Sequence, residues 1–149
     1  MLEATLCFLV RGEERQEVLL GPKKVGFGRG KYGGVGGKLD ENESPIHAAA
    51  RELFEETGIG PVEVARLQPL PPIGTAPNRT PILGSLFRVD LTRAEYEARV
   101  AADDEVIAVE LLDTNSLRKL VTAGGIYVTL PLSMLLHFFL GRSGPGDAA

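Results

Sequence analysis

The chain has 149 residues, of which 44% are hydrophobic and 24% are charged, the size and balance of one globular domain with a full core. These proportions exclude a fibrous, coiled-coil or disordered protein. Sixteen Lys and Arg residues against 20 Asp and Glu give a net charge of -4, which disfavours nucleic acid as a partner held by bulk neutralisation of its phosphates. An anionic substrate would therefore need local cations or a metal ion at its site.

The cysteine content and the apolar segments bear on location. Cys7 is the one cysteine, so no internal disulfide can form, which fits a reducing cytoplasm. Residues 1–10 have no basic amino-terminal region, and the most hydrophobic segment, residues 126–140, is broken by Pro131 and His137 and is too short to span a bilayer of about 30 Å. We expect a cytoplasmic protein with no membrane partner.

The amino-terminal part predicts a hairpin followed by an irregular segment. Residues 5–10 and 17–20 are typical of two strands joined by a charged turn. Residues 26–37 contain seven glycines, too many for a regular element, so we expect a backbone shaped for special torsions or for close approach of a ligand.

A well-marked helix is predicted over residues 45–57. Ser44 can cap it, Pro45 suits its first position, and Gly58 can end it in a left-handed conformation. The expected buried stripe follows helical spacing and consists of Ile46, Ala49, Ala50, Leu53 and Thr57.

The remaining elements alternate. We expect strands over residues 62–67, 82–90 and 106–112, a short helix or turn over 92–100, and helices over 115–120 and 131–140. Residues 69–81 hold five of the ten prolines and predict an irregular loop. With no repeat and no dividing linker, residues 1–142 predict a single mixed α/β domain, and residues 143–149 a flexible tail.

The helix carries a second face that is acidic. Glu52, Glu55 and Glu56 fall within about a third of a turn of one another, beside the apolar stripe, and such like charges repel. A solvated acidic face is one interpretation. The other is a site for Mg²⁺, which favours carboxylates shared with substrate phosphates and would let an acidic protein bind a polyphosphate.

Two phosphate-binding motifs fit the glycine-rich segment poorly. Residues 28–33 match G-x-G-x-x-G, but no helix is predicted to begin there, which argues against a dinucleotide site. Residues 36–38 resemble the end of a P-loop, yet Tyr32 stands where its first glycine should be and Leu39 where Ser or Thr should bind Mg²⁺.

A third motif matches at every specified position. Gly37, Glu43 and the run Arg51-Glu52-Leu53-Phe54-Glu55-Glu56-Thr57-Gly58-Ile59 resemble the Nudix box, G-x5-E-x7-R-E-U-x-E-E-x-G-U. Upstream, residues 18–38 are similar to the MutT homologues that act on oxidised purine nucleoside triphosphates. The resemblance implies a Nudix-type α/β/α sandwich with a mixed sheet and a hydrolase of nucleoside-diphosphate linkages that uses Mg²⁺ or Mn²⁺.

The same resemblance implies roles for individual residues. Glu52, Glu55 and Glu56 would be metal ligands, one of them also orienting or deprotonating the attacking water, and the main-chain carbonyl of Gly37 would bind a metal. A further acid usually comes from a later loop, and Glu105, within the run 103–105, is our choice, with a solvated acid as the alternative. Glu43 and Arg51 would fix the loop to the helix.

The substrate-binding residues are less well defined. Lys23 and Lys38 could hold phosphate, and Phe27, Tyr32 and Tyr127 could stack on a base, although each also suits an ordinary surface or core position. Gly33 stands where MutT homologues typically carry an Asn that reads the base, which predicts relaxed or changed base specificity. The expected substrate is a small nucleotide, with oxidised purine triphosphates first and ADP-ribose as the enzymatic alternative. A Nudix protein that binds a nucleotide without cleaving it is the alternative outside catalysis.

Overall fold

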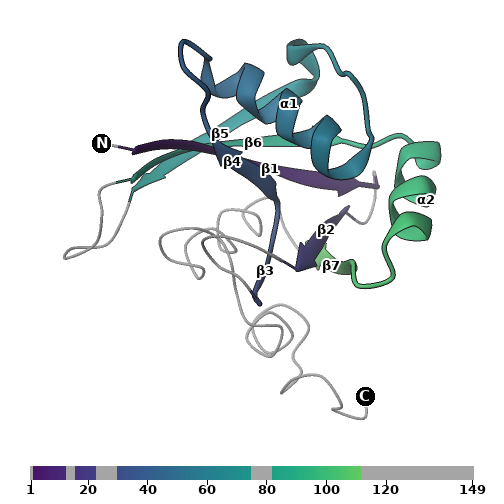
Figure 1. Ribbon diagram of the computed structural model, residues 1–149. Coiled ribbons are helices and arrows are strands. Elements are labelled where there is room, and N and C mark those ends of the chain that lie inside the picture. The colour runs from purple at the N-terminus through teal and green to yellow at the C-terminus, as the bar shows by residue number, and fades with distance from the viewer. Residues whose placement is uncertain (1, 13–15, 23–29, 75–81, 112–149) are drawn as a thin grey trace.

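The computed structural model describes residues 2–12, 16–22, 30–74 and 82–111. In chain order the elements are β1 (Leu2–Arg11), β2 (Gln16–Pro22), β3 (Tyr32–Gly33), β4 (Val35–Lys38), α1 (Pro45–Thr57), a short 3₁₀ helix (Val64–Arg66), β5 (Leu67–Gly74), β6 (Ile82–Asp90), α2 (Arg93–Ala102) and β7 (Ile107–Leu111). One mixed sheet with helices packed on it confirms the predicted α/β class (Figure 1).

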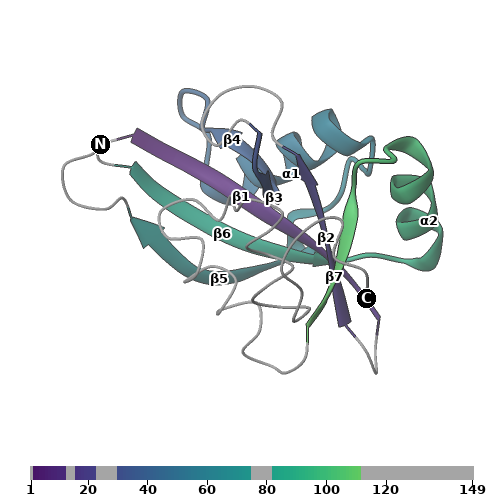
Figure 2. The same ribbon diagram turned by 90° about the horizontal axis from the view of Figure 1, so that it is seen from below.

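Strand β1 is the centre of the sheet. It runs parallel to β6 from the Leu2–Ile82 pair to the Val10–Asp90 pair. Its other edge is shared, because β4 pairs antiparallel with its first half and β2 antiparallel with its second half. Strand β5 lies beyond β6, and β7 lies beside β2 (Figure 2). The shared edge brings β4, which precedes α1, next to the middle of the sheet.

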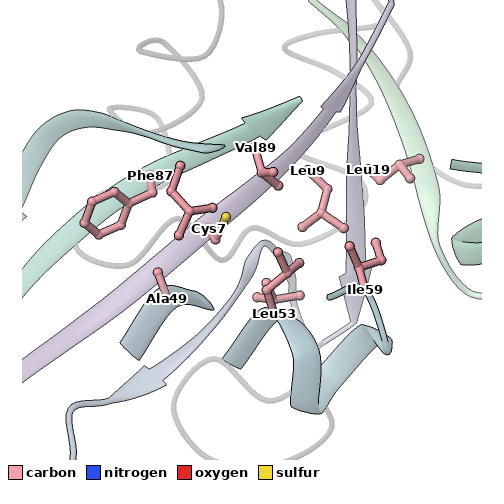
Figure 3. Packing of buried hydrophobic residues seen from close by; sticks show 10 residues of the cluster. Cys7, Leu9, Leu19, Ala49, Leu53, Ile59, Phe87 and Val89 are labelled. Carbon is pink, nitrogen blue, oxygen red and sulfur yellow. The ribbon is translucent and has the colours of Figure 1, made fainter. Parts of the chain in front are cut away.

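Alternation along the strands gives the sheet two buried faces. On the face covered by α1, the cluster consists of Cys7, Leu9, Leu19, Val35, Ala49, Leu53, Ile59, Leu67, Phe87 and Val89 (Figure 3). The opposite face buries Leu6, Phe8, Val10, Val18, Leu20, Leu86, Val109 and Leu111. Helix α1 therefore lies against an apolar surface supplied by several strands.

The helix predicted at residues 45–57 is confirmed to the residue, with Ser44 as its cap and Gly58 after its end. Within the expected stripe Ala49 and Leu53 are fully buried, and Ile46 and Ala50 pack against the same cluster. Ala48 is fully buried although the stripe did not include it. The hairpin at 5–20, the strand at 82–90, the helix at 92–100 and the strand at 106–112 are confirmed with shifts of a few residues at their ends.

The predictions for residues 62–81 were wrong in two ways. Residues 64–66 form a 3₁₀ helix instead of a strand, and β5 continues through Pro69, Pro71 and Pro72, where an irregular loop was expected. Strand β5 ends the path of strands on its side of the sheet, and prolines are tolerated at an edge because their missing N–H is not required there. The register shifts between Leu70 and Ile73, where two of these prolines lie.

The expectation of irregular backbone in the glycine-rich segment was also wrong for Tyr32–Gly33 and Val35–Lys38, which are strands. Where close approach of a ligand was expected, the structure shows close approach of the β1 backbone to Gly34 and Gly36. A Cβ on Gly36 would lie 1.9 Å from the Thr5 carbonyl oxygen, and one on Gly34 would lie 2.5 Å from that of Cys7. Strand β4 can adopt this position against β1 only because these residues lack side chains.

The helices predicted at 115–120 and 131–140 and the tail at 143–149 lie outside the described residues. Among the helices that the structure describes, none is long and apolar enough to cross a membrane.

Candidate active site

Both ends of α1 are fixed by local contacts. The Ser44 hydroxyl accepts a hydrogen bond from the His47 N–H at 3.3 Å. At the other end Gly58 has a φ of 76°, and its N–H donates to the Phe54 carbonyl at 2.9 Å. These caps and the buried face set the rotation of the helix, which directs Glu52, Glu55 and Glu56 away from the core.

Arg51 joins the acidic residues of α1 to the preceding loop. Its Nε and Nη2 donate to the two Glu43 carboxylate oxygens at 2.9 and 3.0 Å, a bidentate pair. Its Nη1 donates to Glu52 at 3.1 Å and to Glu55 at 3.2 Å. The guanidinium thus offsets the repulsion between like charges, and the predicted role of Glu43 and Arg51 in fixing the loop to the helix is confirmed.

The electrostatics of this network follow from its hydrogen bonds. Bonds from Arg51, and then one from the Asp40 N–H at 2.9 Å, hold the pKa of the Glu43 carboxyl below its usual range. The same contact with Glu43 raises the pKa of Arg51. Glu43 is therefore an ionised structural partner rather than a group available for proton transfer.

The backbone of β4 lies directly against the helix carboxylates. Glu56 accepts a hydrogen bond from the Gly36 N–H at 2.9 Å. A Cβ on Gly37 would lie 2.5 Å from the Oε1 of Glu52, so any larger residue there would displace the Glu52 carboxylate. The structure therefore brings together Gly37, Glu52 and Glu56, and places Glu55 on the same helix beside Arg51.

This arrangement suits a hard divalent cation. Carboxylate and carbonyl oxygens are the ligands that Mg²⁺ prefers, and Glu52, Glu55 and Glu56 offer carboxylates from one helix beside the backbone of β4. Among the described residues, the acidic ligand atoms found within 4.8 Å of one another are those of residues 103–105 and not those of the three helix glutamates. Arg51 contacts one carboxylate oxygen of Glu52 and one of Glu55. A cation can therefore bind the other oxygen of each carboxylate while these contacts remain. The donor set thus fits the metal that the sequence predicts.

A second acidic group precedes β7. One ligand oxygen each of Asp103, Asp104 and Glu105 lie within 4.8 Å of one another, and the Glu105 N–H donates to Asp103 at 3.0 Å. Asp104 and Glu105 are exposed, whereas the Asp103 side chain is 20% exposed. Glu105, our choice from sequence, therefore lies within a cluster of acidic residues, with Asp103 as its more enclosed neighbour, and its role as a metal ligand stays a prediction.

A pocket of about 250 Å³ adjoins the end of α1. Its wall consists of Leu9, Leu19, Gly21, Pro22, Gly33, Gly34, Val35, Glu56, Arg99, Asp103 and Val106. Glu56 and Asp103 thus face one cavity from two different elements. Gly33, at the position that the MutT comparison singles out, also lines it.

Sequence reasoning missed Arg99 as a pocket residue. It lies on α2, within the segment predicted as a short helix or turn, and nothing in the local pattern separates it from Arg93 on the same helix. Of the predicted substrate-binding residues, Lys38 is exposed at the end of β4, and its carbonyl accepts a hydrogen bond from Arg51 at 3.2 Å. Lys23, Phe27 and Tyr127 lie outside the described residues.

Comparison with known proteins places this site in a family. The chain is 48% identical over 59 residues to the oxidized purine nucleoside triphosphate hydrolase of Mus musculus, a match that covers 40% of this chain and only 38% of that protein. It is 31% identical over 105 residues to Phosphatase NudJ of Escherichia coli K12, which covers 66% of each. A MutT/nudix family protein from Enterococcus faecalis has a similar fold, with a TM-score of 0.59 at 23% identity over 74% of this chain and 44% of that one.

The NUDIX domain model matches residues 2–130, which include every described element of the sheet and both helices. The match contains the β4–α1 junction, where the glutamates, Arg51 and Gly37 are brought together. The chain belongs to the Nudix family.

Proposed function

We propose that the chain is a Mg²⁺-dependent Nudix pyrophosphohydrolase that converts nucleoside triphosphates, oxidised purine triphosphates among them, to the monophosphate and pyrophosphate. The observation that carries the proposal is the contact between the α1 carboxylates and the β4 backbone, Glu56 with the Gly36 N–H and Glu52 against Gly37. Of the carboxylates in this contact, that of Glu56 belongs to the pocket wall. The partial similarity to the mouse enzyme supports the choice of substrate.

In this proposal the chain holds the metal through Glu52, Glu55, Glu56 and the Gly37 carbonyl, with Glu105 joining from the second acidic group. A bound divalent cation neutralises phosphate charge and lowers the pKa of water. Attack of water on phosphorus forms one P–O bond and breaks the P–O bond of the bridge between the α- and β-phosphates. The products are therefore the monophosphate and pyrophosphate. One of the glutamates orients the water and accepts its proton.

The pocket wall supports a tolerant base site. Leu9, Leu19 and Val35 offer apolar contact, and Gly33 has no side chain with which to read a base edge. Without a buried hydrogen-bonding side chain at that position, the pocket lacks one means of rejecting analogues. We therefore expect activity on several nucleotides, with a preference for purines set by contact area. The negative net charge supports a small nucleotide rather than a nucleic acid as the partner.

The first experiment is a substrate panel. Purified protein with Mg²⁺ is incubated with ordinary and oxidised nucleoside triphosphates, ADP-ribose and dinucleoside polyphosphates, and released monophosphate and pyrophosphate are measured. The proposal expects turnover of triphosphates with pyrophosphate as product. Turnover of ADP-ribose alone would reject the substrate and keep the hydrolase, and nucleotide binding without turnover would favour the non-catalytic alternative.

Variants test the site itself. Glu52→Gln and Glu56→Gln should each lower kcat by about 10²–10⁴-fold, since each removes a charged oxygen ligand with little change of shape. Glu63→Gln is the matched control, because Glu63 is exposed and lies outside the pocket wall. Equal activity of Glu56→Gln and Glu63→Gln would show that the metal site is elsewhere.

A further inference from the structure

Arg99 differs from the other arginines of the described residues. Five of them donate at least one side-chain hydrogen bond of 3.2 Å or shorter: Arg11, Arg51, Arg66, Arg88 and Arg93. Within the part of the chain that the structure describes, the Arg99 guanidinium donates none, and its one ion-pair contact is Nη1 to the Asp103 Oδ2 at 3.8 Å. That distance is too long for a hydrogen bond.

The side chain of Arg99 is nevertheless well enclosed. It is 12% exposed, against 87% for Arg93 on the same helix. A guanidinium carries five N–H donors and cannot lose its charge. Among the described residues no side-chain nitrogen or oxygen is fully buried without a hydrogen-bond partner, so the Arg99 nitrogens that have no partner remain accessible. The side chain is therefore held in a position whose hydrogen-bonding capacity is unused by the described residues.

The Arg99 N–H donors that have no described partner belong to a residue of the pocket wall, which also contains the Glu56 carboxylate. Arg99 lines the cavity together with Glu56 and Asp103. Arg99 lies next to Gly21 of β2, because a Cβ built on Gly21 would lie 3.4 Å from the Arg99 Nη2. The guanidinium thus rests over β2 in the same wall as a proposed metal ligand.

Contacts of α2 with the rest of the fold hold Arg99 at this place. Arg66 donates to the two Glu95 carboxylate oxygens at 2.6 and 3.0 Å, and the Arg11 guanidinium lies 4.0 Å from the centre of the Tyr96 ring. Glu95, Tyr96 and Arg99 are three and four residues apart, so they share one side of the helix. When these contacts form, Arg99 is directed toward the pocket.

We infer that Arg99 binds a phosphate group of the nucleotide substrate through its guanidinium fork. The inference rests on the proposed function and adds a residue that the family motif does not contain. A phosphate beside Glu56 would contact both the metal and the Arg99 guanidinium. Arg99 would thus supply the local positive charge that a protein of negative net charge needs in order to bind an anion. The planar fork matches two phosphate oxygens, and the Asp103 carboxylate lies 3.8 Å from its Nη1.

The test compares Arg99→Gln and Arg99→Lys with Arg93→Gln, an exposed arginine of the same helix. Calorimetry with Ca²⁺ in place of Mg²⁺ gives the Kd of inorganic pyrophosphate and of a purine nucleoside without phosphate, and kinetics give KM and kcat for the best triphosphate of the panel. We expect Arg99→Gln to raise the pyrophosphate Kd and the KM by about tenfold or more and Arg99→Lys by less, since charge remains and the fork is lost. Nucleoside binding and Arg93→Gln should be unchanged.

Three outcomes would overturn the inference. If Arg99→Gln binds pyrophosphate like wild type but melts at a lower temperature, Arg99 is a structural partner of Asp103. If nucleoside binding falls instead, the residue contacts the base. Should Arg99→Gln fail to fold, an Arg99→Lys variant with wild-type Kd and KM would exclude the fork contact. The proposed function fails if the wild-type protein shows no turnover of any compound. In that case the Kd of pyrophosphate for wild type and the Arg99 variants still tests the role of Arg99 separately.

Discussion

The two helices that meet at the pocket are attached to the sheet by different forces. Helix α1 buries Ala48, Ala49 and Leu53 completely, and Leu53 packs within the larger cluster of Figure 3. Helix α2 has no fully buried residue. Its attachment depends more on polar contacts, chiefly the Arg66–Glu95 pair and the position of Arg11 over Tyr96, and Tyr96 is its partly buried apolar contact with the cluster under α1.

This difference separates two parts of one site. Glu56 comes from the packed helix, whereas Arg99 and Asp103 come from the helix with polar contacts and from its carboxyl-terminal cap. Apolar burial gives a stability that is spread over many contacts, while a few ion pairs can open locally at low cost. We expect the metal ligands to be held rigidly and the phosphate-binding side to move more readily.

The largest effect should come from the core under α1. Leu53→Ala removes a fully buried side chain and should lower the free energy of unfolding by about 2–5 kcal/mol, measured by urea denaturation. The matched change on α2 is Val100→Ala, which shortens a side chain that is 42% exposed and should cost no more than about 0.5 kcal/mol. Equal losses from the two variants would mean that α2 also depends on apolar packing.

A smaller effect is expected at the polar junction of α1. Arg51→Gln removes the bidentate partner of Glu43 and leaves Glu52 and Glu55 as neighbouring like charges, which should cost about 1–3 kcal/mol of unfolding free energy. Arg93→Gln, which breaks an exposed pair with Glu97, should cost less than about 0.5 kcal/mol. A neutral Arg51→Gln would show that the caps and the buried face alone hold the loop.

Helix α1 could be predicted from the sequence because its signals are local. Ser44, Pro45 and Gly58 mark its ends, and the spacing of its apolar residues gives its buried face. The contact of Arg51 with Glu55 could also be predicted, since residues four apart on a helix are neighbours. The pairing of Arg51 with Glu43 was implied by the resemblance to the Nudix box and not by helix spacing. The three glutamates proposed as metal ligands, Glu52, Glu55 and Glu56, lie on the same helix, so the sequence also predicted their position relative to the core.

The failures concern features that depend on distant parts of the chain. Strand β5 tolerates its prolines because it lies at a sheet edge, a fact of topology. Strand β4 forms because its glycines meet the backbone of β1, which no local pattern reveals. Arg99 and Arg93 have the same sequence character, and only the direction in which α2 docks places one of them in the pocket and the other in solvent.

The main ion pair of α2 can be tested by pH. The hydrogen bonds from Arg66 lower the pKa of Glu95 to about 2, below its value in the unfolded chain, so ionised Glu95 stabilises the fold at neutral pH and this contribution is lost as the pH falls toward 2. Glu95→Gln should lower the free energy of unfolding by about 1 kcal/mol at pH 7. Urea denaturation from pH 7 to pH 2 should show the difference from wild type shrinking below about pH 4.5.

The matched control for this pair is Glu97→Gln, which removes an exposed partner of Arg93 on the same helix. It should change the unfolding free energy little at any pH in this range, because exposed ion pairs contribute weakly. The free energies of unfolding of Glu95→Gln and wild type should become similar at pH 2. If they still differ there, the Glu95 carboxyl acts through its shape or through the hydrogen bond that it accepts from the Thr92 N–H, and not through its charge.

The smallest effect should come from the contact between Arg11 and Tyr96. Arg11→Gln removes the cation over the ring and should lower the free energy of unfolding by less than Glu95→Gln does, while Glu17→Gln breaks the Arg11–Glu17 pair and leaves Arg11 over Tyr96. Native-state amide exchange measures where the loss falls. Faster exchange in α2 with α1 unchanged, for Arg11→Gln but not for Glu17→Gln, is expected if the two helices open separately. Equal acceleration in both helices would show that they open as one unit, and the polar contacts of α2 would then contribute to global stability rather than to local movement of Arg99.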